Sequence, residues 1–314
     1  MVKYILKRVV QTVTVMLLVS FITFLLVSVM PKDPVYALFG SDVTPDEYQV
    51  LYERLGLNQP VFVRYWNWLK DILHGEFGTS YAYKMPVLEL VGQKIGVTLY
   101  MSIVSTLISF PLGMLFGVIT AVKRGKWQDN VFTFLANIMG SIPGFVIAIV
   151  VLWVFCVQLK WLPSSGFAFP WDDFQTHIQT IIMPMFCLVL GGVAGVTRQT
   201  RSSMLEAIRQ DYVRTARSKG LKENYIIRKH VLRNGLVPII TLIGGRLAMM
   251  IGGSVFIENV FSIPGMGALM VNSVNKVDVP VIQICVLLTA ACISLSYLLT
   301  DLLYLAVDPR ISLE

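Results

Sequence analysis

The stretch VTLYMSIVSTLISFPLGMLFGVITAV, residues 97–122, carries no charged side chain. An α-helix needs about 20 mostly apolar residues to cross a bilayer, so this stretch is long enough to do so. The other stretches that meet the same criterion are Val9–Met30, Phe132–Gln158, Ile178–Thr197, Gly235–Ile257 and Pro280–Val307. The sequence therefore predicts an all-α polytopic membrane protein with six transmembrane helices.

The composition of the whole chain agrees with this prediction. Of its 314 residues, 55% are hydrophobic and 14% are charged, whereas soluble domains have about 25% charged residues. High hydrophobicity with few charges also excludes an intrinsically disordered chain. The four cysteines lie inside apolar stretches and form no CxxC pair, so we expect small core residues rather than disulfides or metal ligands.

The distribution of lysine and arginine predicts the orientation in the membrane. Seventeen of the 26 lie on the side that holds both chain ends, eight lie on the other side, and Arg246 lies inside the fifth apolar stretch. Because cytoplasmic loops carry an excess of these residues, we expect both termini and the loop 198–234 in the cytoplasm. The predicted organisation is a tail with an uncleaved first helix over 1–30, an external segment over 31–96, a five-helix core over 97–307 and a cytoplasmic tail over 308–314.

The cytoplasmic loop 198–234 has a pattern of its own. From Ser202 onward, apolar residues recur at four-residue spacing, at Met204, Ile208, Tyr212 and Ala216. This spacing predicts one amphipathic helix that ends near Gly220, followed by a second short helix over Lys222–Val231. Such helices either dock in a groove of another protein or lie on lipid headgroups. Nucleic acid is not an expected partner, because no binding fold accompanies the basic residues.

The external segment 31–96 also shows helical patterns. Thr44 followed by Pro45 predicts the start of a helix that runs to about Leu55. A second amphipathic helix is expected over Val61–Leu73, with the aromatic residues Tyr65, Trp66 and Trp68. These aromatics are either anchors at the membrane interface or a docking face. The segment as a whole either meets an external partner or forms a lid over the pore.

Residues typical of catalysis are sparse. The histidines His74, His177 and His230 lie in three separate segments, and there is no GxxxxGK[ST] phosphate loop. An ion-coupled carrier would need acidic residues within its spans, yet the spans contain only Arg246 and Asp301 as charged residues. We therefore expect that the chain is no enzyme and that any ATPase is another protein.

Several stretches resemble one known family in the order in which they occur along the chain. They are Arg54–Pro60, Trp68-Leu69, Gly75–Ser80, Asp211–Leu221, His230–Asn234, Phe256–Glu258, Val260–Gly267 and Asp308–Arg310. Together they resemble the inner-membrane permease subunits of peptide/nickel-type ABC importers, which have the type I importer fold. The resemblance implies transport of oligopeptides or dipeptides, or of nickel, nickel chelates or opines.

The same resemblance implies the partners. They are a second homologous permease subunit, two ABC ATPase subunits, an external substrate-binding protein and membrane lipid. ATP and Mg²⁺ would be held by the ATPases, so no cofactor is expected on this chain. A channel or a secondary carrier without an ATPase is the alternative.

The resemblance further implies two groups of site residues. The coupling motif that meets the ATPase would comprise Asp211, Arg214, Thr215, Ala216, Lys219, Gly220 and Leu221. The general motif begins EAA, whereas this chain has Arg214-Thr215-Ala216 at that place. The external signature loop would comprise Glu258, Pro264, Gly265 and Gly267.

Arg246 fits none of these motifs. A charge near the middle of a bilayer is costly, so its side chain should face protein or water. It either pairs with an acid such as Glu258 or Asp301, or lines the translocation path and meets an anionic group of the substrate, or extends to an interface. We place it on the translocation path.

Overall fold

The computed structural model describes residues 2–29, 33–40, 42–240 and 242–307. The described residues are mostly helical, and their β-pairing is limited to one isolated antiparallel bridge between Thr79 and Pro86. This confirms the all-α prediction. The chain divides into two compact units, one from residues 1–98 and 264–292, the other from residues 99–263 and 293–314. The Asp308–Arg310 motif lies outside the described residues.

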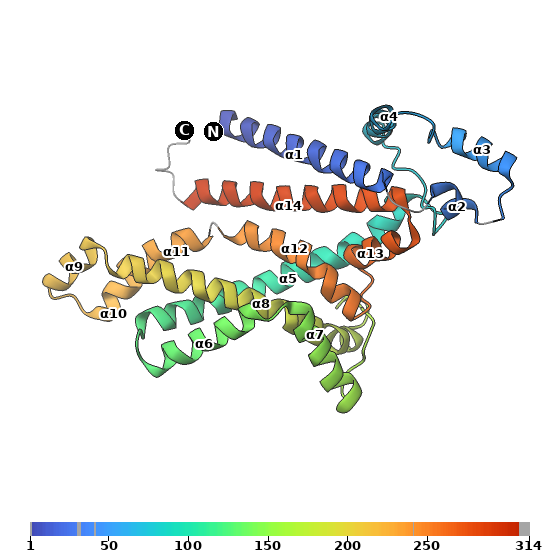
Figure 1. The fold of residues 1–314 in the computed structure, drawn as a ribbon. Helices are drawn as coiled ribbons and strands as arrows, with labels where there is room; N and C mark the ends of the chain where they lie inside the picture. Colours follow the sequence, from blue (N-terminus) through green and yellow to red (C-terminus); the bar gives the residue numbers. More distant parts are fainter. Residues whose placement is uncertain (1, 30–32, 41, 241, 308–314) are drawn as a thin grey trace. The chain divides into compact units, whose positions relative to one another are not determined.

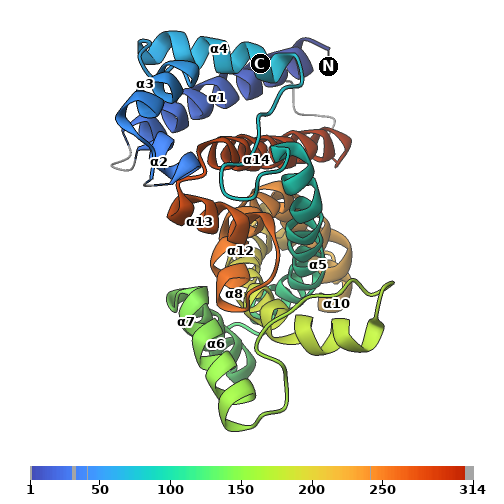
Figure 2. The same ribbon diagram turned by 90° about the vertical axis from the view of Figure 1, so that its right-hand side faces the viewer.

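The first unit contains four helices from the N-terminal part of the chain and parts of three later ones. They are α1 (Val2–Ser28), α2 (Pro34–Phe39), α3 (Pro45–Arg54), α4 (Val61–Leu73), the start of α5 (Val87–Val122), α13 (Met266–Lys276) and the start of α14 (Val279–Val307). Helix α4 packs against the C-terminal part of α1 (Figures 1 and 2). Tyr65 and Trp68 of α4 pack on Phe24 of α1 at ring-centroid distances of 5.6 and 5.8 Å. Of the three aromatics predicted for this helix, only Trp66 is exposed, so the other two stabilise the helix pair.

Local sequence explains where α3 begins and where α4 begins and ends. The Thr44 hydroxyl accepts a hydrogen bond from the Glu47 amide, and the Glu47 carboxylate accepts one from the Thr44 amide, which forms a capping box. Pro45 occupies the first turn, where its missing N–H costs nothing. Helix α4 has the predicted ends, but α5 begins at Val87, before the apolar stretch that starts at Val97.

The second unit is built around the long helix α8 (Phe174–Ile208). Helices α6 (Trp127–Ser141), α7 (Gly144–Leu152), α11 (Leu232–Ile240) and α12 (Ile243–Val260) pack against it (Figure 1). Helix α5 also approaches closely, because a side chain at Gly113 or Gly117 would clash with Val196 or Thr200 of α8. Small residues four apart allow such close packing of helices in membranes.

The prediction of six spans is not confirmed. Four described helices are long and apolar enough to cross a membrane, at Leu6–Ser28, Val87–Val122, Phe174–Ile208 and Val279–Asp301. A fifth is possible if α6 and the segment Gly144–Gln158 form one span, but these two are bent by 93°. The bend falls at Ile142-Pro143, where Ile142 is extended because a residue before proline disfavours helix. The stretch Gly235–Ile257 corresponds to α11 and α12, neither of which is among the four.

Candidate coupling and translocation sites

The coupling segment is divided differently from the prediction. Helix α8 ends at Ile208, and a new helix, α9 (Asp211–Ser218), follows after an extended Gln210. The prediction of a single helix from Ser202 to Gly220 is therefore wrong. Because the helix is interrupted, Tyr212 is exposed, and the buried face of α9 consists of Val213 and Ala216.

The buried face of α9 belongs to a small core beneath the loop. This core contains Ala121, Met204, Ala207, Val213, Ala216, Ile226 and Val231. The last two residues come from a one-turn π-helix, η2 (Ile226–Val231), which follows α10 (Glu223–Tyr225) and matches the second predicted helix. Ala216 is only 6% exposed, so its side chain packs into this core and does not lie on the surface of the loop.

The remaining residues of the predicted coupling motif are exposed. They are Asp211, Arg214, Thr215, Lys219, Gly220 and Leu221. Gly220 has a φ of 76°, and nothing lies within 4 Å of where a side chain would begin. The glycine is therefore needed for its left-handed backbone and not to relieve crowding. The outer surface of α9 and the turn after it are thus open to a partner.

An ion pair that the sequence analysis missed closes this turn. The Arg217 Nε and Nη2 atoms donate to the two Glu223 carboxylate oxygens at 3.1 and 2.6 Å. The paired Arg217 guanidinium lowers the pKa of Glu223 below its usual range. Bidentate pairs of this kind fix orientation, so α9 and α10 are held on either side of Gly220. The only sign of this ion pair in the sequence is that two opposite charges, Arg217 and Glu223, lie on either side of Gly220.

Arg246 is bound by backbone carbonyl groups. Its Nη2 atom donates to the carbonyl oxygens of Gly191 and Gly192 in α8, at 3.1 and 2.5 Å. No carboxylate among the described residues lies within ion-pair distance of it, and Glu258 instead accepts a hydrogen bond from Ser254. The alternative in which Arg246 pairs with an acid such as Glu258 or Asp301 is therefore not found among the described residues. Because the guanidinium is half-buried and its charge is not neutralised by a carboxylate, it can still receive an anionic group.

Glycines in neighbouring helices make room for arginine side chains. A side chain at Gly195 would clash with Arg246, and one at Gly140 would clash with Arg198. Arg198 in turn donates to the Ala136 carbonyl at 2.9 Å. The glycine-rich part of α8 is therefore shaped around a guanidinium group. Carbonyl partners have no sequence signature, so this arrangement could not be predicted.

The predicted external signature loop is mostly buried. In the second unit, Glu258 is 0% exposed at the end of α12, and its carbonyl accepts from the Ile263 amide at 2.8 Å. In the first unit, Gly265 and Gly267 are buried at the start of α13, and only Pro264 is exposed. These contacts favour a structural role for most of the motif.

A second missed residue, Asp278, anchors the Gly75–Ser80 motif. Its carboxylate is 0% exposed and accepts hydrogen bonds from the Ser80 hydroxyl at 2.5 Å and from the amides of Tyr81 and Ala82 at 2.9 and 3.1 Å. A buried carboxylate is stable only when it is hydrogen-bonded in this way. Asp278 thus fixes the loop that precedes α5 to the start of α14, and the motif has a local structural purpose.

Known families and proteins match this chain over nearly its whole length. Residues 113–313 match the family described as binding-protein-dependent transport system inner membrane component, and residues 1–102 match its N-terminal family. A Brucella ovis protein named "Putative peptide permease protein" is 39% identical over 99% of both chains. The oligopeptide transport system permease protein AppB of Bacillus subtilis is 36% identical, also over 99% of both chains.

Solved structures agree on the fold. An inward-facing MetNI methionine ABC transporter has a chain that is 20% identical, with a TM-score of 0.55, and the match covers 71% of this chain and 98% of that one. An amino acid ABC transporter chain gives a TM-score of 0.52 at 17% identity, covering 71% of this chain and 94% of that one. Among the described residues, no group of three or more His, Cys, Asp or Glu side chains could hold a metal ion.

The matches to the family models and to the relatives show that the chain belongs to the binding-protein-dependent inner-membrane permeases of ABC importers, which are multi-pass membrane proteins and not enzymes in themselves.

Proposed function

We propose that this permease carries oligopeptides or dipeptides into the cell. The observation that supports this proposal is the full-length similarity to proteins named as peptide permeases in two distant bacteria. Nickel, nickel chelates and opines are the other substrates that a permease of this type could carry. The residues that follow α9 are exposed and offer a surface to which a partner protein can bind. They are Lys219, Gly220 and Leu221.

In this proposal the chain performs no covalent step. ATP and Mg²⁺ bind to two partner ATPases, and closure of the ATPases pushes on the exposed surface of 211–221. The Arg217–Glu223 pair keeps that surface rigid, so the push passes through the core beneath the loop to α8. A second permease subunit completes the pore, and the external binding protein delivers the substrate to 31–96 and the 258–279 loop. Both termini lie in the cytoplasm in this proposal, with segment boundaries at 30, 96 and 307.

Uptake by the reconstituted transporter tests the substrate class. The chain is purified with the permease, ATPases and binding protein encoded beside it, and proteoliposomes are given labelled tripeptide, Ni²⁺ with a chelator, or an opine. ATP-dependent accumulation of tripeptide alone supports the proposal. Accumulation of Ni²⁺ or opine without tripeptide would replace it, and uptake driven by an ion gradient without ATP would favour a secondary carrier.

The Arg246 guanidinium is expected to bind the anionic end of the substrate on the translocation path. Arg246→Met should lower uptake of free-carboxylate peptides about tenfold or more while leaving basal ATPase activity and uptake of C-terminally amidated peptides nearly unchanged, since a charge-assisted hydrogen bond is lost. Arg246→Lys keeps the charge but not the planar fork, so an intermediate loss is expected.

Two glycine variants test whether displacement of the Arg246 guanidinium, rather than a general folding defect, lowers uptake. Gly195→Ala should displace the guanidinium and reduce uptake, whereas Gly252→Ala, on α12 with open space around it, should not. Normal uptake by both Arg246→Met and Gly195→Ala would show that Arg246 has no role with substrate. Uptake lost equally for free and amidated peptides would mark Arg246 as purely structural.

A further inference from the structure

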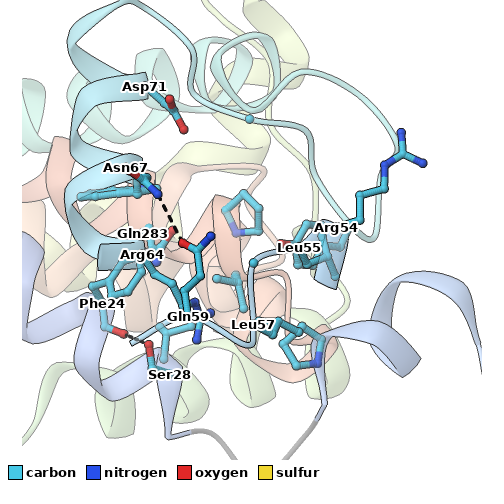
Figure 3. Close-up of a pocket in the computed structure, with 18 of the residues that line it drawn as sticks. Phe24, Ser28, Arg54, Leu55, Leu57, Gln59, Arg64, Asn67, Asp71 and Gln283 are labelled. Carbon is cyan, nitrogen blue, oxygen red and sulfur yellow. Dashed lines mark hydrogen bonds between the residues drawn. The ribbon is translucent and has the colours of Figure 1, made fainter. Parts of the chain in front are cut away.

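The first unit contains a cleft that the coupling and translocation sites do not use. Its volume is about 760 Å³, and it lies between α4, the connection from α3 to α4, the end of α1 and the start of α14 (Figure 3). Polar and aromatic side chains both line it. A volume of this size is typical of pockets that bind small molecules.

One face of α4 forms a wall of this cleft. Arg64, Asn67, Trp68 and Asp71 line it, and they follow one another at the spacing of a single helical face. Figure 3 shows Asn67 and Asp71 on the same side of α4. Arg64 and Asp71 are two turns apart, so their attachment points are separated by about 10 Å along the helix axis. The wall thus has a positive group near one end and a negative group near the other.

The charged groups of this wall are not neutralised by salt bridges. Among the residues that the structure describes, no opposite charge lies within ion-pair distance of Arg64 or Asp71. The Arg64 guanidinium instead lies 5.8 Å from the centroid of the Phe24 ring, which leaves its hydrogen-bond donors available. Between the two charges, Asn67 donates to the Gln59 side chain at 3.4 Å. This amide pair is weak enough to exchange for peptide groups.

We propose that this cleft binds a short peptide with free termini. Arg64 receives the terminal carboxylate, Asp71 receives the terminal ammonium group, and the Asn67 and Gln59 amides bind the peptide backbone. Two to three extended residues span about 7–11 Å, which matches the separation of the charges along α4. Phe24 and Trp68 offer apolar surface to the peptide side chains. The inference rests on the proposed function, since it assigns a second contact for the same substrate class on the external segment.

Binding to the full permease complex in nanodiscs, without the binding protein, tests this site. The probe is a labelled tripeptide with free termini, compared with its N-acetylated and C-amidated forms. For the native chain, each blocked form is expected to bind at least about tenfold more weakly than the free one, because one charge-assisted contact is lost. This arm needs no variant, so it does not depend on whether a substitution folds.

Two variants then assign the ends of the peptide. Arg64→Gln should weaken binding of the free tripeptide about tenfold but leave binding of the C-amidated form unchanged. Asp71→Asn should weaken binding of the free tripeptide by a similar factor but leave binding of the N-acetylated form unchanged. Lys70→Gln is the control, since Lys70 is an exposed base on α4 that does not line the cleft.

The outcomes separate this inference from the proposed function. Equal affinity for free and blocked peptides, or unchanged affinity of both cleft variants, would overturn the cleft assignment. Absence of tripeptide binding by complexes whose full transporter still imports tripeptide would also overturn it while leaving the peptide function intact. If the full transporter imports no peptide, the proposed function itself fails.

Discussion

Replacing Gly220 by valine is expected to abolish stimulation of the partner ATPase by substrate while the chain still inserts in the membrane. Gly220 has a φ of 76°, which a β-branched residue adopts only with strain. The cost of about 1–2 kcal/mol shifts the population of the native turn about 5–30-fold. The strain acts on an exposed turn, so most of the fold persists and the coupling surface is lost. Substrate-stimulated ATP hydrolysis by the purified complex measures the effect.

Gly125 provides a matched control for this experiment. It also has a φ of 76°, nothing lies within 4 Å of where its side chain would begin, and it belongs to a different exposed turn. Gly125→Val should therefore carry the same strain without loss of coupling. Gly220→Asn should retain most coupling, since asparagine tolerates the left-handed region. Normal substrate-stimulated ATP hydrolysis in Gly220→Val, or an equal loss of it in Gly125→Val, would show that the Gly220 turn has no special role in coupling.

Asp278→Ala is expected to cause the largest loss of stability. Its buried carboxylate accepts three hydrogen bonds from Ser80, Tyr81 and Ala82, and alanine would leave these donors without an acceptor. Hydrogen bonds to charged groups contribute about 1.5–3 kcal/mol each, so a loss of at least about 3 kcal/mol is expected. The fraction of protein that survives heating in detergent, followed by size-exclusion chromatography, measures it.

Graded and control variants make this test specific. Ser80→Ala removes the hydroxyl that donates to Asp278 and accepts from the Tyr83 amide, but it leaves the two amide bonds to Asp278, so it should cost about 1.5–3 kcal/mol. Asp172→Ala removes an exposed carboxylate and should change stability by less than about 0.5 kcal/mol. The loss for Asp278→Ala combined with Ser80→Ala should be smaller than the sum of the two, because they share one bond. Stability of Asp278→Ala equal to that of Asp172→Ala would contradict the anchoring role.

Local sequence was enough to predict α3 and α4, whereas the apolar stretches Phe132–Gln158 and Gly235–Ile257 are each interrupted in the structure. The capping box at Thr44 and the ends of α4 agree with the prediction because the signals lie within one turn. The ends of other helices depend on contacts that are distant in sequence. Helix α5 extends back to Val87 because that turn is buried against α13 and α14, and periodicity alone did not reveal the break before α9.

Among the candidate site residues, too, those with a local sequence signal were predicted and those with partners distant in sequence were missed. The helix end near Gly220 was predicted correctly, since a glycine after a helical pattern is a local signal, and Gly220 has a positive φ. Ala216 was assigned to the coupling motif from the resemblance, whereas in the structure its side chain is buried in the core beneath the loop. Asp278 and the carbonyl partners of Arg246 were missed, since Ser80 lies 198 residues from its acceptor and a carbonyl group is present at every residue.

The exposed surface of 211–221 is expected to contact the partner ATPase directly. Single cysteines at Arg214, Leu221 or Ala216, in a chain whose native cysteines have been replaced, allow site-specific cross-linking within the purified complex. A cross-linked product with the ATPase is expected from the exposed positions 214 and 221 and none from position 216, whose side chain is buried in the core of the loop. Absence of ATPase cross-links from 214 and 221 in a complex that hydrolyses ATP, or equal cross-linking from 216, would contradict it.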